Sequence, residues 1–242
     1  QISQIRESIK YDNQNLYYRE NNGNITKAKS LSSAPSHPLL RERVGVRGQS
    51  NGSDIMLLAV GDVLEGAEAF AGGETRTITI DGVQYTVKNK LTTANDLSYS
   101  KDTSTGELTL IASNFEIRGQ SDVAHNLIIS GKSNSIYGGD LADTIEELNS
   151  NCSNNYIYGG AGNDTIILRG GSSAYGEEGD DIFIAYSGVC YGGIGNDTIT
   201  RYGGSGVSYG GEGDDVFNIY SSNAKYFGEE GNDTFNIIGS LS

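Results

Sequence analysis

The chain has 242 residues, including 34 Gly, 15 Tyr, two Cys and no Trp, and it carries a formal charge of -14. Its hydrophobic content of 36% is low for a large compact core. The longest apolar run, Ile55 to Val60, falls far short of the roughly 20 residues of a membrane-spanning helix, so we expect no membrane span. The first residue is Gln1 and no charged-then-apolar leader is visible, which we interpret as a mature or excised portion of a protein.

The acidic residues gather in the C-terminal half of the chain. Residues 136–242 hold 16 Asp and Glu against three Lys and Arg, whereas residues 1–50 hold eight basic and four acidic residues. An acidic surface repels nucleic-acid phosphates and anionic membranes. We therefore expect no nucleic-acid partner, and a cation is the partner that the charge favours.

The first segment, residues 1–53, is rich in Asn and Ser and contains both prolines, Pro35 and Pro38. This composition is typical of a polar segment or linker. A short helix is expected around Ile2 to Tyr18. A segment that cannot form a core of its own is usually ordered by a partner, so it also indicates assembly.

Residues 54–113 are expected to form a small antiparallel β unit. Thr77–Ile80 and Val83–Val87 flank Asp81-Gly82, the dipeptide that favours a type I′ turn. A second pair of strands is expected at Leu97–Ser100 and Leu108–Ala112, on either side of a polar loop. The following stretch, Phe115 to Gly131, is interpreted as one or two irregular starting coils of the next domain.

Residues 114–242 contain an internal repeat. In each copy, a Gly is followed five residues later by Asp and, two residues after the Asp, by an apolar residue. The six copies begin at Gly138, Gly159, Gly176, Gly192, Gly210 and Gly228. The intervals between them are 21, 17, 16, 18 and 18 residues. Apolar residues alternate on both sides of each turn, so each period supplies two short strands. The sequence predicts an all-β fold: a right-handed parallel β-roll or β-solenoid of about six coils.

The turns read GGAGNDTI, GEEGDDIF, GGIGNDTI, GGEGDDVF and GEEGNDTF. They resemble the GGxGxDxUx nonapeptide of the RTX, or hemolysin-type, calcium-binding repeat family of bacterial secreted proteins. The resemblance covers residues 136–235. Glycines at positive φ direct carbonyl oxygens to one place, and the Asp adds a carboxylate there. Calcium takes about six to eight oxygen ligands, which two stacked turns can supply.

The resemblance implies a set of calcium ligands in this chain, for up to five ions between six turns. The carboxylate ligands are Asp143, Asp164, Asp181, Asp197, Asp215 and Asp233. The carbonyl ligands, from the second and fourth turn positions, are Gly160, Gly162, Glu177, Gly179, Gly193, Gly195, Gly211, Gly213, Glu229 and Gly231. Leu141 and Ala142 depart from the pattern, which puts the Asp143 site in doubt. A carbonyl ligand tolerates Glu at the second position, but a strict positive φ does not.

The array is expected to be one-sided. Typical RTX arrays repeat every nine residues and bind ions along both edges, whereas the opposite turns here, such as Arg169–Ser173 and Gly203–Gly206, lack the Asp. A competing interpretation is an ordinary solenoid in which each Asp caps its turn by accepting backbone hydrogen bonds.

A row of aromatic residues precedes the repeated Gly: Tyr137, Tyr158, Tyr175, Tyr191, Tyr209 and Phe227. The row is expected to face outward, where it can bind a sugar or a protein, although stacking along the strands explains it as well. Cys190 is expected to point inward, and Cys152 is out of phase with it, a poor disulfide pairing.

The chain is not expected to be an enzyme. Its only histidines are His37 and His125, and neither lies in an HExxH or GxSxG context.

We expect a calcium-binding structural module of a secreted or cell-surface protein that folds on extracellular calcium. Two alternatives stay open. One is a self-assembling subunit of an extracellular filament or surface layer, associating through open solenoid ends, the N-terminal segment or the Tyr face. The other is an accessory or secretion module of a larger hydrolase or toxin.

Overall fold

The computed structural model describes residues 10–12, 15–19, 25–27, 45–50, 53–58, 63–220 and 223–238. Every regular element in these ranges is a β-strand, so no helix there is long and apolar enough to cross a membrane. The chain divides into two compact units, residues 1–66 with 102–104, and residues 67–101 with 105–242. Each unit is described by itself.

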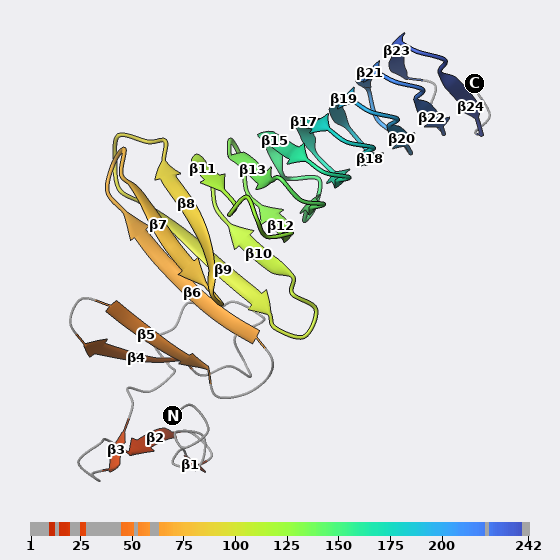
Figure 1. The fold of residues 1–242 in the computed structure, drawn as a ribbon. Helices are drawn as coiled ribbons and strands as arrows, with labels where there is room; N and C mark the ends of the chain where they lie inside the picture. Colours follow the sequence, from red (N-terminus) through yellow and green to blue (C-terminus); the bar gives the residue numbers. More distant parts are fainter. Residues whose placement is uncertain are drawn as a thin grey trace. The chain divides into compact units, whose positions relative to one another are not determined.

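The first unit contains two small antiparallel sheets (Figure 1). One is formed by β1 (Lys10–Asp12), β2 (Asn15–Arg19) and β3 (Ile25–Lys27), and the other by β4 (Gly45–Ser50) and β5 (Ser53–Leu58). The helix expected around Ile2 to Tyr18 is therefore wrong where that stretch is described. Tyr11, Tyr17 and Tyr18 lie in these strands, and aromatic residues favour strands. Much of the N-terminal segment lies outside the described residues.

The second unit is built from two sheets that face each other. In order along the chain, the first sheet contains β6 (Val63–Phe70), β9 (Asn95–Asp102), β10 (Leu108–Ile111), β12 (Asn126–Ser130), β14 (Thr144–Glu147), β16 (Thr165–Leu168), β18 (Ile182–Ala185), β20 (Thr198–Arg201), β22 (Val216–Ile219) and β24 (Thr234–Ile237). The second contains β7 (Thr75–Ile80), β8 (Val83–Asn89), β11 (Phe115–Arg118), β13 (Ser135–Gly139), β15 (Ser153–Ala161), β17 (Gly171–Glu178), β19 (Gly188–Ile194), β21 (Gly206–Glu212) and β23 (Ala224–Glu230).

Both predicted hairpins are present. β7 and β8 pair antiparallel through Asp81 (φ 51°) and Gly82 (φ 81°), and β9 pairs with β10. Positive φ at both central residues is the signature of a type I′ turn. β8 then pairs antiparallel with β11, while β10 pairs in parallel with β12, so the hairpins extend the same two sheets. The expected boundaries after residues 53 and 113 stay predictions.

From β11 onward the chain forms a parallel β-solenoid. We number its coils 1 to 7, each formed by consecutive strands, from β11 with β12 to β23 with β24 (Figure 1). The predicted all-β parallel solenoid is thus confirmed: the six repeats form six coils, and the stretch Phe115 to Gly131, expected to form one or two starting coils, forms one. Equivalent residues stack in register; for example, Ile166 pairs with Ile145 on one side and Phe183 on the other.

Alternate residues of the coils point into a continuous core. In β16, Ile166 and Leu168 are fully buried while Thr165 and Ile167 are half-buried on the outer side. Cys152 and Cys190 are buried free thiols, so Cys190 points inward as expected. Two charged side chains, Glu147 and Arg201, also occupy inward positions and are fully buried.

Candidate metal centre

The repeated Asp side chains lie inside the coils, at the point where each turn enters a strand of the first sheet. In coils 2 to 6 each is at most 2% exposed, and these residues are Asp143, Asp164, Asp181, Asp197 and Asp215. Asp233, in the coil of β23 and β24, is half-buried. The structure therefore brings the predicted carboxylates into one internal row.

One oxygen of each carboxylate caps the neighbouring coil. Oδ1 of Asp164 accepts the backbone N–H of Asp143 at 2.7 Å, and Oδ1 of Asp181 accepts the N–H of Asp164 at 2.7 Å. The same bond links Asp181 to Asp197 and Asp197 to Asp215, each at 2.8 Å. This ladder fulfils the capping role of the competing interpretation, but it uses only one oxygen of each carboxylate.

The second oxygen, Oδ2, is shielded from solvent and has no hydrogen-bond donor among the described residues; this holds for Asp143, Asp164, Asp181, Asp197 and Asp215. The first Gly of each turn explains its place. A Cβ on Gly176 would lie 1.9 Å from Oδ2 of Asp181 and 2.6 Å from the carbonyl oxygen of Gly192 in the next coil. Gly159 and Gly210 repeat this arrangement with their own Asp and next coil. The missing side chain thus leaves room for two acceptor oxygens that face one space.

Such an arrangement calls for a positive charge. The pKa of Asp164, Asp181 and Asp197 is raised in each case to about 7: burial is the largest cause, the backbone N–H bond to the carboxylate opposes it, and neighbouring carboxylates add to it. Burial also raises the pKa of Asp143 and Asp215. A proton can satisfy each Oδ2 in acid, whereas above neutral pH the charged carboxylates are unfavourable unless a positive charge compensates them.

The turns have the backbone geometry that the Gly spacing predicts. φ is positive at the second and fourth positions in coils 3 to 7: Gly160, Gly162, Glu177, Gly179, Gly193, Gly195, Gly211, Gly213, Glu229 and Gly231. A Cβ on Gly195 would lie 2.1 Å from the carbonyl oxygen of Gly179, so these carbonyls point along the solenoid axis to the next coil. The expectation that Glu would not take a strict positive φ is wrong, since Glu177 has φ 80° and Glu229 has φ 77°.

A second ladder runs along the outside of the same turns. Asp180 donates its N–H to Oδ1 of Asn163 at 3.1 Å, and Oδ1 of Asp180 accepts the N–H of Asn196 at 2.7 Å. Asp214 and Asn232 continue the series. Asn and Asp alternate in it, so charged members are separated by a neutral amide, which limits repulsion between stacked coils. The alternation is visible in the sequence, but its role follows only from the stacking.

Coil 1 carries a degenerate copy of the turn. A Cβ on Gly119 would lie 2.3 Å from Nε2 of His125 and 2.6 Å from the carbonyl oxygen of Gly138. The His125 ring therefore occupies the place of the Asp carboxylate. The backbone N–H of His125 donates to Oδ1 of Asp143 at 2.6 Å. Its ring is buried beside the Tyr85 hydroxyl. The row of carboxylates thus ends at an imidazole, which sequence reasoning missed because this turn is one residue longer.

Asp143 shares the arrangement of the later coils although its turn departs from the pattern. It is 2% exposed, its Oδ1 accepts a backbone N–H, and its Oδ2 has no donor among the described residues. A Cβ on Gly138 would lie 2.1 Å from Oδ2 of Asp143, as in the later coils. Leu141 takes the place of the fourth-position Gly and is 45% exposed.

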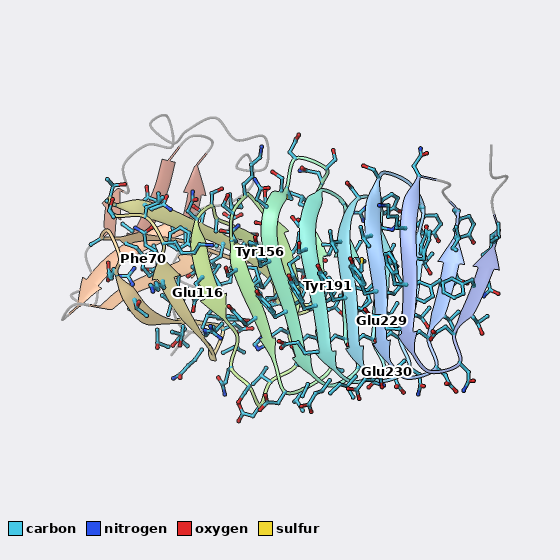
Figure 2. All side chains as sticks on the ribbon, turned by 90° about the horizontal axis from the view of Figure 1, so that it is seen from above. Phe70, Glu116, Tyr156, Tyr191, Glu229 and Glu230 are labelled. Atoms are coloured by element: carbon cyan, nitrogen blue, oxygen red, sulfur yellow. The ribbon has the colours of Figure 1, made fainter. Side chains whose placement is uncertain are left out.

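The aromatic row faces outward, as predicted. Its rings stack on one another with centroids 4.6 to 5.1 Å apart and interplanar angles of 3 to 13°. At one end Arg118 covers Tyr137, with its guanidinium 3.6 Å from the ring centroid. Figure 2 shows Tyr191 on this face and Glu230 beside the row of turns. Because neighbouring rings cover each other's faces, a sugar cannot stack on an internal ring and can meet only ring edges.

Comparison with known proteins finds no relative, so the interpretation of the Asp row depends on the fold and on the geometry of the site. No family model matches the chain, and neither a curated protein nor a solved structure matches it. Within the described ranges, no three or more His, Cys, Asp and Glu side chains gather to hold a metal ion. Any ion at the Asp row would therefore need backbone carbonyl oxygens in addition to carboxylates.

Proposed function

We propose that this chain is a calcium-binding structural module of the RTX type, whose coils close when calcium neutralises the internal Asp row. The observation that carries the proposal is the set of buried Oδ2 atoms without a donor, each facing a backbone carbonyl oxygen of the next coil. Carboxylate and carbonyl oxygens are hard ligands that suit calcium. The outward surface of the same turns is acidic, which raises the local concentration of cations.

The residues that would hold the ions are the Asp row together with the turn carbonyls. The fit is best for Asp164, Asp181, Asp197 and Asp215, because their turns combine a buried Oδ2 with positive φ at the second and fourth positions. Calcium would supply charge neutralisation and cross-linking between coils. Up to ten of the 16 acidic charges in residues 136–242 would be offset by five ions.

This chemistry suits a protein that works outside the cell. Where calcium is scarce, the charged row would keep the coils open; at millimolar extracellular calcium, ligation would close them. We therefore propose a secreted or cell-surface location and a structural rather than catalytic role. The accessory or secretion module of a larger protein shares this mechanism.

A calcium titration of chelator-treated protein, followed by circular dichroism and isothermal calorimetry, tests the proposal. We expect a cooperative gain of β signal, with several ions bound per chain. Magnesium serves as the control, because it demands octahedral geometry and gives up its water reluctantly. A complete β spectrum in chelator at pH 8 that calcium leaves unchanged would show that the Asp residues are caps only.

A second candidate, self-association, is favoured by the exposed last coil. Phe235 and Ile237 stand at inward positions but are 47% and 61% exposed, whereas Phe217, one coil earlier, is fully buried. An uncovered coil presents free strand edges and apolar side chains to another chain. Light scattering in calcium should show association for the parent chain and a monomer for Ile237→Lys; scattering that stays monomeric in both would remove this candidate.

A further inference from the structure

The core of the solenoid contains a cation without a counter-charge. Arg201 lies at an inward position of β20, in register with Ala185 on one side and Ile219 on the other, and it is 0% exposed. No carboxylate of the described residues lies within ion-pair distance of its guanidinium. Burying an unpaired charge is strongly unfavourable, because the charge loses its hydration without a compensating partner.

The contacts that Arg201 does make are all neutral. Nη2 donates to the carbonyl oxygens of Gly188 and Val207, each at 3.2 Å, and to Oγ of Ser208 at 3.1 Å. Its distance to Sγ of Cys190 is 3.7 Å. Burial raises the pKa of the Cys190 thiol to about 11 despite the nearby guanidinium, so the thiol stays neutral at physiological pH. These groups solvate one side of the guanidinium and leave its charge uncompensated.

The other side of the guanidinium carries donors with nothing to accept them. Nη1 is shielded from solvent and has no hydrogen-bond partner in the described part of the chain. The Tyr226 hydroxyl, one coil further along the row of Cys190 and Ser208, is also buried without a partner there. Ser208, whose Oγ lies 3.1 Å from Nη2 of Arg201, is the register partner of Tyr226, so Tyr226 stands one coil from the contact of the guanidinium. Burial raises the pKa of Tyr226, and the charge of Arg201 offsets part of this rise.

Donors without acceptors next to an uncompensated positive charge call for an anion. We propose that Arg201 and Tyr226 hold one small monovalent anion of the halide class inside the solenoid. A halide accepts N–H and O–H bonds from all directions and supplies the missing charge, whereas a water molecule supplies only the hydrogen bonds. Because the site is buried, the ion is taken up as the coils close. The inference is independent of the calcium sites.

The residues that neighbour the guanidinium are small. Cys190 and Ser208 are small inward residues of the second sheet. Ala185, the register neighbour of Arg201 in the first sheet, is also small. A Cβ on Gly206 would lie 2.7 Å from Nη1, so the guanidinium rests against this glycine. The position is therefore built around Arg201 and does not merely tolerate it.

The test measures the stability of the full chain at a fixed calcium concentration while chloride replaces methanesulfonate at constant ionic strength. Above the dissociation constant, each tenfold rise in chloride should lower the unfolding equilibrium constant about tenfold. Tyr226→Phe should shift this dependence to higher chloride, and Arg201→Met should abolish it. Arg169→Met is the matched control, because Arg169 pairs with Glu146 near the surface, and it should keep the parent dependence.

Bromide provides a readout that does not depend on any variant folding. Crystals grown in bromide should show one anomalous peak within hydrogen-bonding distance of Nη1 of Arg201. A stability that is insensitive to chloride, together with a water-sized peak and no bromide signal at Nη1, would overturn the proposal. An equal chloride dependence in the parent chain and in Arg201→Met would overturn it as well.

Discussion

Replacing Asp181 by Asn should have opposite effects with and without calcium. In the metal-free protein the amide oxygen can still accept the N–H of Asp164, while its NH₂ group faces the carbonyl oxygen of Gly192. The substitution therefore removes a buried charge and supplies the donor that Oδ2 lacks. We expect the metal-free protein to become more stable, and the calcium-loaded protein to lose ligands.

The size of the effect follows from the pKa. Burial raises the pKa of Asp181 from 3.8 to about 7, and each pKa unit corresponds to about 1.4 kcal/mol. At pH 8 the charged side chain thus costs roughly 4 kcal/mol of folding free energy when no cation is bound. Asp181→Asn should recover much of this and should also ease ionisation of the neighbouring Asp197, whose pKa the charge of Asp181 raises.

The assay compares the β signal in circular dichroism and its loss in urea at pH 8, in chelator and in calcium, together with a count of bound ions by calorimetry; greater metal-free stability appears as more β signal in chelator. Asp180→Asn is the matched control, because Asp180 is adjacent and exposed, and its Oδ1 bond to the N–H of Asn196 can be kept by Asn. Because the charge of Asp180 also raises the pKa of Asp181 and Asp197, Asp180→Asn should stabilise the metal-free protein less than Asp181→Asn does, and it should keep the parent number of bound ions. If Asp181→Asn destabilised the metal-free protein, or left calcium binding at the parent stoichiometry, the assignment of the Asp row as a cation site would be refuted.

Four further outcomes are expected. Because the pKa of Asp164 is raised in the folded state, the folded chain binds more protons than the unfolded chain between about pH 4 and 7. In urea titrations, the stability of the metal-free protein should therefore fall as the pH rises across this range and level off above it. Calcium should flatten this pH profile. Gly192→Ala should lower stability by about 3 kcal/mol in thermal unfolding, since its Cβ would lie 2.1 Å from Oδ2 of Asp197. Glu177→Gly should raise the free energy of unfolding in denaturant by about 1 kcal/mol, because it relieves a positive φ; an unchanged value would argue against strain. Glu147→Gln should cost about 2 kcal/mol, because Oε2 accepts the backbone N–H groups of Arg169 and Gly170; a neutral result would contradict a structural role for this buried carboxylate.

The Asp row also explains why the first turn residue must be Gly. Sequence reasoning attributed the glycines to positive φ, which holds at the second and fourth positions. At the first position the reason is different: the carboxylate of the same turn and a carbonyl of the next coil occupy the space of the missing side chain. A spacing of Gly and Asp five residues apart therefore encodes an inward carboxylate as well as a turn.

The sequence by itself determined the parts of this protein that repeat. The repeat period predicted the parallel solenoid, the alternation of apolar residues predicted the buried rows, and Asp81-Gly82 predicted the first hairpin. These features could be predicted because each depends on residues that are neighbours along the chain. The helix around Ile2 to Tyr18 failed where described, since propensity there favours strands. The ligand set and the calcium itself stay predictions.

The tertiary structure decided what depends on contacts one coil apart. That Oδ1 of each Asp is used and Oδ2 is not follows from the register between coils, which separates bonded partners by 16 to 21 residues. His125 as the end of the row, and Arg201 as a cation without a counter-charge, emerge in the same way. A repeat specifies which residues face inward, but only the stacked coils show which of their polar atoms find partners, because those partners belong to other coils.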